Sequence, residues 1–302
     1  MMSGPDPVRA VRDIQRLSLF PIVFSVGPVM SAALGDSYGE QCSSVMSAAE
    51  ALLQEQSTQG KCSGEDRRLT LLAALTLPLR ACRDDSNPKP KQRLSAPSCI
   101  ILNALKWKRK DEECVTALHA AAPQLLQCYH QLQSAPGLSE GQTEGNRELR
   151  VKLGRLLCEL GKLGLVQQGL SLAPLLTLPE AAPLGIDSAV AAAEQSEACS
   201  ASPQPSAGST AEARTEVYRT LQSAVEAFGL QDCWKTKLLL SGKEVMGMLG
   251  IQGKQVGKVR DQLADWQLAH PQASAQECKE WLEANKETVL AHANAALDAL
   301  EK

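Results

Sequence analysis

Leucine recurs at helical spacing between Arg147 and Leu163, and this pattern most narrows what the chain can fold into. Six leucines form one stripe there, namely Leu149, Leu153, Leu156, Leu157, Leu160 and Leu163. The charged residues Arg150, Lys152, Arg155 and Lys162 lie away from the stripe or at its edge, which predicts an amphipathic helix. Alanine and leucine are abundant throughout, while aromatic residues make up only 3% of the chain. Since alanine and leucine favour helices and strands prefer aromatic and β-branched residues, we predict an all-α protein.

Several other segments carry signals for the ends of helices. Asp6-Pro7 predicts a helix start, because Asp can cap free amides and Pro is tolerated at the first helical position. Capping boxes predict three more starts, at Ser209–Glu212, Ser241–Glu244 and Ser274–Glu277. Apolar spacing predicts further helices near residues 45–54, 65–80, 98–107 and 111–133, the last interrupted at Pro123, with a loop over 83–97.

The composition changes between Pro179 and Ala213, where Ala, Ser, Pro and Glu dominate and Lys and Arg are absent. Such a sequence cannot build a core, so we predict a flexible, disordered linker over 179–213. The predicted domains are therefore a helical body over 1–178 and a smaller helical tail over 214–302.

The cysteines and one apolar segment bear on the compartment of the protein and on whether the chain crosses a membrane. The ten cysteines include no CxxC pair, and the four histidines have no cysteine cluster beside them. We therefore expect no metal site, and we interpret Cys99, Cys114, Cys128 and Cys158 as buried free thiols of an intracellular, reducing compartment. The apolar segment Leu19–Leu34 contains two prolines and is too short to cross a membrane, so we interpret it as a buried turn.

Basic residues are concentrated in two stretches of the sequence. Residues 67–110 contain eleven Lys and Arg against two acids, and residues 235–260 contain six against Glu244 alone, although the whole chain has a net charge of −3. Separated basic stretches suit a polyanion, because each neutralised phosphate releases counterions. The alternative is that these cations only solvate helix faces and pair with nearby acids.

The segment Gly247–Lys258 is rich in glycine and lysine. It fails as a Walker phosphate loop, since Met248 and Gln255 stand where Gly and Ser or Thr are needed. A helix starting at Gly253 could still hold one phosphate through its free amides and through Lys254 and Lys258. The alternative is a plain corner between two helices, where glycine permits a tight turn.

Sequence elements in the second half resemble the C-terminal end of plant- or algal-type CCA-adding enzymes, the tRNA nucleotidyltransferases. The resemblance is carried by Leu240–Met246, by the Gly-Lys-x-x-Gly-Lys corner, by Trp266-Gln267-Leu268 and by Glu277–Trp281. Residues 4–24 look like the start of the body domain of that family. The resemblance implies that the chain is the helical body and tail of such an enzyme, and that the catalytic head is missing.

The resemblance also implies partners and site residues. The partner would be tRNA, with a separate catalytic head as a possible second partner and no membrane. No catalytic residue, metal or cofactor is assigned to this chain, whereas the parent family uses ATP, CTP and Mg²⁺. The expected RNA-binding residues are Lys243, Lys254, Lys258 and Arg260 in the tail, and Lys106, Lys108, Arg109 and Lys110 in the body.

Two other hypotheses remain open from the sequence. The chain could be a helical scaffold or protein-interaction protein that kept the fold without RNA binding, which the long linker and the acidic C-terminus fit. It could also be part of an enzyme whose head is encoded upstream of Met1. The compartment is not distinguished, because the family serves the cytoplasm, nucleus, mitochondrion and plastid.

Overall fold

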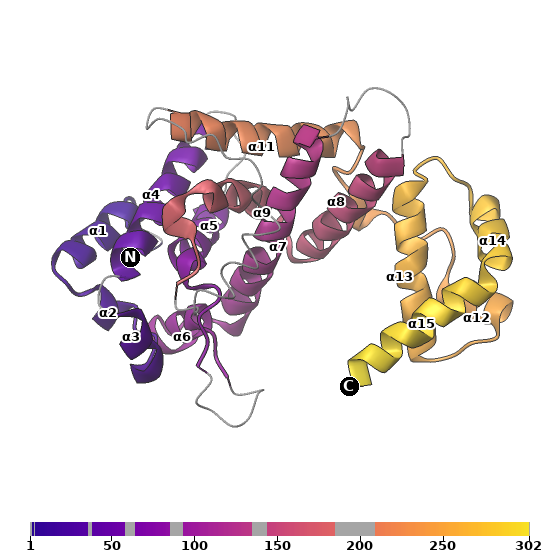
Figure 1. Ribbon diagram of the computed structural model, residues 1–302, viewed down its shortest axis with the longest axis horizontal. Helices are drawn as coiled ribbons and strands as arrows, with labels where there is room; N and C mark the ends of the chain where they lie inside the picture. Colours follow the sequence, from indigo (N-terminus) through magenta and orange to yellow (C-terminus); the bar gives the residue numbers. More distant parts are fainter. Residues whose placement is uncertain are drawn as a thin grey trace. The chain divides into compact units, whose positions relative to one another are not determined.

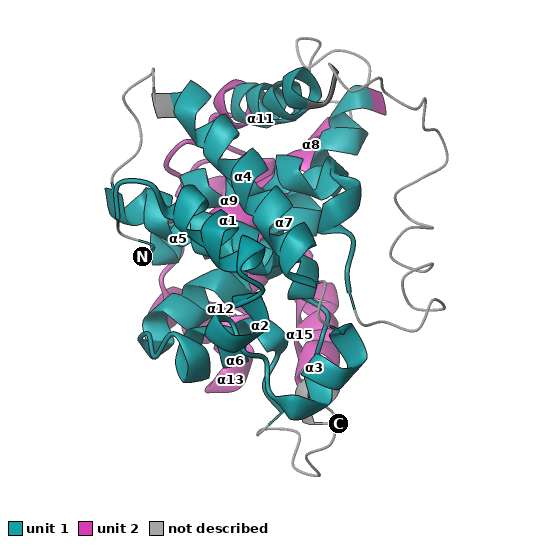
Figure 2. Ribbon diagram, turned by 90° about the vertical axis from the view of Figure 1, so that its left-hand side faces the viewer, with its two compact units in different colours: residues 1–133, 160–224 teal, residues 134–159, 225–302 magenta. Residues whose placement is uncertain are grey.

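The computed structural model of the chain describes residues 2, 4–35, 38–57, 64–84, 93–134, 144–184 and 209–301. These residues form helices joined by turns, with no strand among them, and Arg83 and Ser95 make an isolated antiparallel bridge. The prediction of an all-α protein is therefore confirmed. The chain divides into two compact units, one from 1–133 with 160–224 and the other from 134–159 with 225–302 (Figure 2).

Each unit takes residues from two separate stretches of the chain, whereas the predicted domains were continuous. Residues 185–208, the main part of the predicted linker, lie outside the described residues. The division into 1–178, 179–213 and 214–302 therefore stays a prediction. The first residues of that linker are attached to the first unit, because Arg80 Nη1 donates to the carbonyl of Ala181 at 2.6 Å and Leu184 N donates to Pro78 O at 2.8 Å.

The first unit is built around two long helices, α4 (Tyr38–Ser57) and α5 (Gly64–Thr76), which pack against each other (Figure 1). Helix α1 packs on α4, and α9 packs on both α4 and α5. The other helical elements are α1 (Pro7–Arg16), α2 (Phe20–Val23), α3 (Pro28–Leu34), α6 (Ala96–Cys99), α7 (Arg109–Ser134), α9 (Val166–Leu172), most of α11 (Ser209–Ala227) and short 3₁₀ turns at Leu77–Leu79, Ala173–Thr177 and Pro179–Ala181.

The N-terminal helix begins as predicted. The Asp6 side chain accepts a hydrogen bond from Arg9 N at 2.9 Å, and Pro7 occupies the first helical position.

The prediction of a buried turn over Leu19–Leu34 was wrong, because this segment forms α2 and α3. Prolines at the starts of these helices cost no hydrogen bond there. Only one side is buried: Phe20 packs against Phe24 and Tyr38, while Ile22 is 72% exposed. No helix among the described residues is long and apolar enough to span a bilayer.

Two other elements differ from the prediction. Helix α7 runs through Pro123 without a break, because the apolar residues on either side of that proline are buried and hold the helix together. The predicted helix over 98–107 is α6 followed by a π-helical turn over Ile100–Ala104, where Leu105 N donates to Ile100 O at 2.8 Å.

The second unit contains the start of α8 (Glu144–Leu163), the end of α11, α12 (Gly242–Leu249), α13 (Lys254–Ala269), α14 (Ala275–Ala284) and α15 (Lys286–Glu301). Helix α13 packs against α12 and α15, and α14 packs against α15. Their shared core includes Leu240, Val245, Leu249, Val259, Leu263, Leu282 and Val289. Both capping boxes predicted in this part, Ser241–Glu244 and Ser274–Glu277, are confirmed. The side chain of Ser209, in the third box, lies outside the described residues.

The predicted leucine stripe of α8 is buried from Leu149 to Leu160, but Leu163 is 43% exposed. Leu163 is the last residue of the helix, and Gly164 follows it with φ +74° and turns the chain away. Cys99, Cys114 and Cys128 are buried as predicted and form no disulfide among the described residues, whereas Cys158 is half-buried.

Candidate functional site

The basic tail residues lie on the two helices that flank the glycine-rich corner. Lys243 is exposed near the start of α12, and Lys254 begins α13 directly after Gly253, whose φ of +63° suits glycine. The predicted helix start at Gly253 is therefore confirmed. The same geometry is that of a turn between two helices, so it leaves the phosphate and corner interpretations both available.

The four tail residues form two groups rather than one, with Lys243 on α12 and the other three on α13. Lys254 and Lys258 are one helical turn apart and share a face of α13. Arg260 lies about 200° further round the helix from Lys258, because each residue turns the helix by about 100°. Its side chain instead faces the start of α12, where a Cβ at Gly242 would lie 3.9 Å from Arg260 Cδ. Arg260 is thus brought next to the residue that precedes Lys243.

Acidic side chains accompany these cations. Asp261 Oδ2 lies 3.9 Å from Lys258 Nζ, and Glu244 Oε1 lies 3.1 Å from Lys279 Nζ. Hydrogen bonds from the backbone and side chain of Ser241, followed by the contact with Lys279, lower the pKa of Glu244 to about 2. Glu244 therefore stays ionised at neutral pH and reduces the positive charge at the start of α12.

The body residues Lys106, Lys108, Arg109 and Lys110 are all exposed and lie where the π-helical turn ends and α7 begins. Lys106 has a φ of +55°, an uncommon backbone conformation for a residue other than glycine. The structure brings these four residues together on one short stretch of the first unit. One of them has an acidic neighbour: Arg109 Nε lies 3.8 Å from Glu112 Oε2.

Three other arginines of the basic stretch hold the first unit together. Arg67 makes two hydrogen bonds to the Glu50 carboxylate, at 3.1 and 2.6 Å. Arg68 donates to Asp111 at 2.9 Å, and its guanidinium lies 4.4 Å from the centre of the Trp107 ring. These side chains join α5 to α4 and α7, so they contribute to folding rather than to a free cationic surface.

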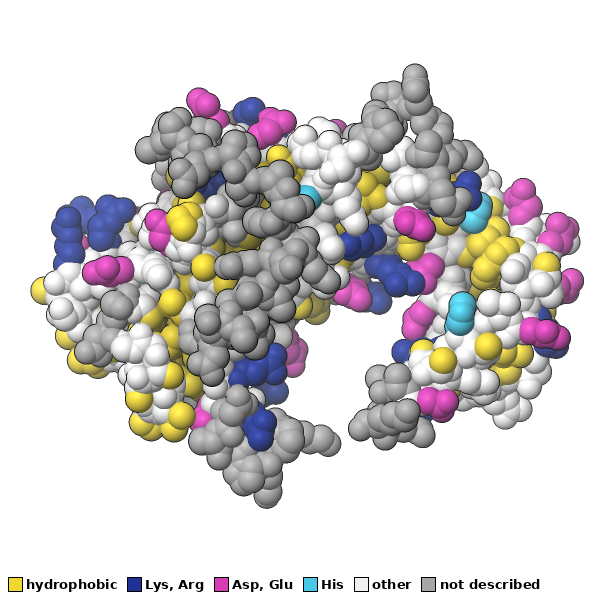
Figure 3. Space-filling view, viewed as in Figure 1, with side chains coloured by type: hydrophobic (Ala, Val, Ile, Leu, Met, Phe, Trp, Pro, Cys, Tyr) yellow, Lys and Arg dark blue, Asp and Glu magenta, His cyan; other side chains and the backbone are white. Residues whose placement is uncertain are grey.

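The acids and cations are also mixed in the space-filling view. On the face shown in Figure 3, dark blue Lys and Arg side chains occur in small groups with magenta Asp or Glu side chains nearby. Lys89 and Lys91 lie outside the described residues. A high count of basic residues in a stretch of sequence therefore does not translate directly into one cationic face.

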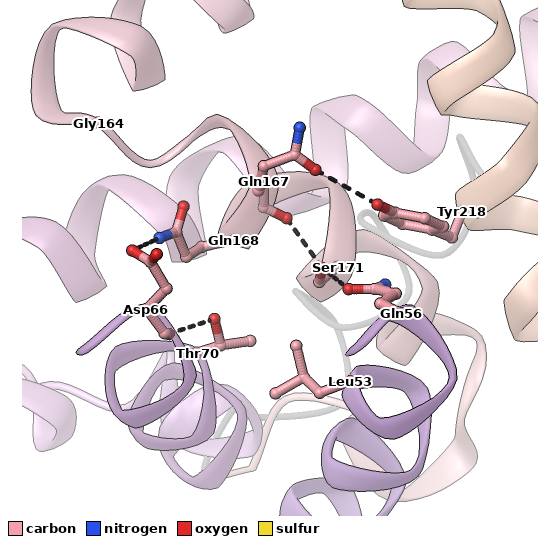
Figure 4. Close-up of a pocket in the computed structure, with 9 residues that line it drawn as sticks. All are labelled: Leu53, Gln56, Asp66, Thr70, Gly164, Gln167, Gln168, Ser171 and Tyr218. Atoms are coloured by element: carbon pink, nitrogen blue, oxygen red, sulfur yellow. Dashed lines mark hydrogen bonds between the residues drawn. The ribbon is translucent and has the colours of Figure 1, made fainter. Parts of the chain in front are cut away.

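A small polar cavity of about 100 Å³ lies in the first unit between α4, α5 and α9 (Figure 4). Gln168 donates to Asp66 at 2.5 Å, and Ser171 donates to Gln56 at 3.0 Å. Gln56 Nε2 and Gln168 Oε1 are buried without a protein partner. A donor and an acceptor facing a cavity of this size suit ordered water, which needs two to four polar partners. We interpret it as a hydrated part of the core.

A larger cleft of about 360 Å³ lies in the second unit, at a place that the sequence did not predict. It is formed by the start of α8 and by the turn between α13 and α14, together with Phe228. Its polar lining comes from Asn146, Arg147, Arg150, His270, Gln272 and Glu277. The sequence offered one signal, since Arg147 and Arg150 are three residues apart on a helix, but the residues opposite them come from much later in the chain, at Phe228 and beyond.

Within the described ranges, no three His, Cys, Asp or Glu side chains come together as a metal site would require. The two acids of the first basic stretch are Asp84 and Asp85, and only Asp84 is among the described residues.

Comparison with known proteins gives one informative match. Over 70 residues the chain is 31% identical to the tRNA nucleotidyltransferase cca2 of Schizosaccharomyces pombe. The matched segment is 23% of this chain and 14% of that relative, so the chain spans only a small part of the length of the relative it matches. No protein-family profile matches the chain, and no solved structure matches it. A segment of the chain is thus similar to part of a tRNA nucleotidyltransferase.

Proposed function

We propose that the chain is the tRNA-binding C-terminal region of a CCA tRNA nucleotidyltransferase of the plant or algal type, and that it holds the tRNA backbone without being catalytic alone. The observation that carries the proposal is the segment shared with a tRNA nucleotidyltransferase. The exposed cations at the two ends of the α12–α13 corner support it. In this proposal the nucleotides ATP and CTP and the Mg²⁺ ions belong to a catalytic head, which would be a separate partner of this chain.

The tail cations have the chemistry that a phosphate backbone requires. Lysine and arginine side chains bind phosphates by charge and by hydrogen bonds, and contacts to phosphate position an RNA without reading its sequence. Helical RNA is recognised mainly by its shape and its backbone. Lys254 with Lys258, and Lys243 with Arg260, would then contact two neighbouring parts of one RNA strand.

The body cations would add a second contact region. Lys106, Lys108, Arg109 and Lys110 are exposed and consecutive or nearly so, which places four positive charges within five residues of the chain. Arg67 and Arg68 do not belong to this set, because their guanidinium groups are bound to Glu50 and Asp111.

Salt-dependent binding of tRNA tests the tail contacts. The variant Lys254→Gln/Lys258→Gln/Arg260→Gln removes three cations without placing new apolar groups on the surface. If each contacts one phosphate, the slope of log K against log salt should become shallower by roughly 2 to 3, at 0.7 to 0.9 per contact. Affinity at low salt should fall by more than tenfold, a loss of about 1.4 kcal/mol or more.

A matched control carries the same change of charge elsewhere. The variant Arg9→Gln/Arg12→Gln/Arg16→Gln removes three exposed arginines from α1, outside the proposed contacts. It should alter the slope much less than the tail variant. Equal tRNA affinity and equal slopes for the wild type and the tail variant would rule out the tail assignment.

A scaffold function is the second candidate, and one observation favours it. Several cations of the basic stretches are paired with acids inside the fold, including Arg67 with Glu50, Arg68 with Asp111 and, more loosely, Lys258 with Asp261. Under this alternative the remaining cations only keep the surface hydrated. Purification of the tagged chain from cells should then recover protein partners and no tRNA above background.

A further inference from the structure

The cleft of the second unit has the features of a binding site that the proposed tail and body contacts do not include. Its volume of about 360 Å³ falls in the range of pockets that bind small organic molecules, whereas the 100 Å³ cavity of the first unit does not. Its lining combines two arginines with two flat rings, those of Phe228 and His270. That combination suits a ligand with an anionic end and a planar end.

Arg147 and Arg150 are placed in the cleft by the geometry of α8. Together with Gly154 they are spaced three and four residues apart, so they lie along one face of the helix. Gly154 allows α8 to approach the end of α13 closely, because a Cβ there would lie 2.7 Å from Leu268 Cδ2. Arg155, on the next position, is paired with Asp265 of α13 and fixes the same contact.

The guanidinium of Arg150 has no acceptor among the described residues. Its Nε is shielded from solvent and has no hydrogen-bond partner, and no carboxylate is paired with it. Burial lowers the pKa of Arg150, an effect that the nearby Cys233 partly opposes. An unpaired buried donor is costly, and a guanidinium binds an oxyanion with two parallel hydrogen bonds. A bound phosphate would supply the missing acceptor.

The planar side of the cleft is held rigidly. His270 stacks on Trp266 with ring centres 4.6 Å apart, and its Nδ1 donates to the Trp266 carbonyl at 2.9 Å. Trp266 in turn packs beside Trp281 at 5.6 Å. This fixes the imidazole plane and leaves Nε2 without a partner among the described residues. A nucleobase packs well against such fixed flat rings.

One residue of the lining opposes an anion. Glu277 contributes a carboxylate to the cleft, where it accepts hydrogen bonds from Ser274 N at 2.7 Å and Ser274 Oγ at 2.9 Å. These bonds are the capping box of α14, and they lower the pKa of Glu277. The carboxylate is therefore ionised and structurally occupied, and it limits the affinity for a phosphate rather than excluding one.

We propose that this cleft binds one nucleotide, with Arg147 and Arg150 on its phosphate and with Phe228 and His270 against its base. The nucleotide can come from an RNA strand or from a free nucleoside monophosphate, since both offer a phosphate next to a planar base. In the RNA case the site rests on the proposed function and gives it an anchoring point beyond the surface lysines.

Isothermal titration of the full chain tests the site with two probes, AMP and an unmodified tRNA transcript. Arg150→Gln should weaken binding of the responsive probe by at least about tenfold, because a hydrogen-bonded charge is removed. Glu277→Gln should tighten binding, because glutamine keeps the capping box while the negative charge is removed. Lys286→Gln, an exposed residue of α15 outside the cleft, is the control with the same charge change as Arg150→Gln.

The two probes separate the sources of the nucleotide. If the substitutions of Arg150 and Glu277 change the affinity for AMP but not for tRNA, the cleft binds a free nucleotide. If they change the affinity for tRNA but not for AMP, the cleft binds RNA. If Arg150→Gln does not fold, which its thermal melt reports, Glu277→Gln decides alone. The proposal is overturned if Glu277→Gln leaves the binding of both probes unchanged and Arg150→Gln binds them as the control variant does. The tail-lysine variants report on the proposed function separately.

Discussion

Lowering the pH from 7.5 to 5 should destabilise the first unit through His119, a buried histidine on α7. His119 Nε2 donates to the carbonyl of Ala73 at 2.8 Å, and the ring is almost completely buried. Burial lowers the pKa of His119 from 6.5 to about 4, an effect that the hydrogen bond to Ala73 partly opposes and the nearby charge of Arg80 adds to. The imidazole is therefore neutral in the folded state.

The sign and size of the effect follow from this difference. Because the unfolded chain binds the proton first, the stabilisation by neutral His119 is complete above pH 6.5 and is lost as the pH falls toward 4. The full difference of pKa corresponds to about 3.4 kcal/mol, at about 1.36 kcal/mol per pH unit. At pH 5 the loss should be about 2 kcal/mol.

The variant His119→Gln isolates this contribution. Glutamine keeps an N–H that can donate to Ala73 O, but it does not titrate. Urea unfolding of both proteins at pH 7.5 and pH 5, followed by a probe in the first unit, should show a larger loss for the wild type by about 2 kcal/mol. His292→Gln, at an exposed position on α15, should behave as the wild type. Equal losses in the wild type and His119→Gln would refute the reasoning.

Three further predictions concern the second unit. Ser241→Ala removes the N-cap of α12 and should lower the free energy of unfolding by about 1 kcal/mol in urea titrations. The Sγ atoms of Cys158 and Cys233 lie 3.5 Å apart, so diamide should join them in a disulfide that peptide mass spectrometry detects as a loss of two hydrogens. This reaction should be slow, because the hydrogen bond with Cys158 and burial raise the thiol pKa of Cys233. A double-mutant cycle on the bidentate pair Arg155–Asp265, in which Asp265 is half-buried, should give a coupling of about 1 kcal/mol.

The local elements of the fold follow largely from local sequence. The cap at Asp6, the boxes at Ser241 and Ser274 and the start of α13 after Gly253 were all predictable, because each depends on a few neighbouring residues. The continuity of α7 through Pro123 was not, because burial on both sides of the proline outweighs the lost hydrogen bond.

The sites depended on contacts that sequence spacing does not contain. Lys254 and Lys258 share a face because helical period places them there, but the pairing of Arg67 with Glu50 and of Arg68 with Asp111 required three helices to meet. The count of basic residues therefore overstated the cations that remain available to a polyanion. The sequence likewise could not predict that Arg150 Nε lacks a hydrogen-bond partner, because that depends on which helices pack around it.

By itself, the sequence determined the helical class, most helix starts and the separation of charge along the chain, since these depend on residue type and on neighbours within one or two turns. The tertiary structure alone decided which cations form ion pairs with carboxylates and which residues face one another across the cleft at α8. Arg150 and His270 are 120 positions apart in the chain, and only packing of the second unit places both on one cleft. Burial and pairing are properties of that packing, and they set which charges are left for a ligand.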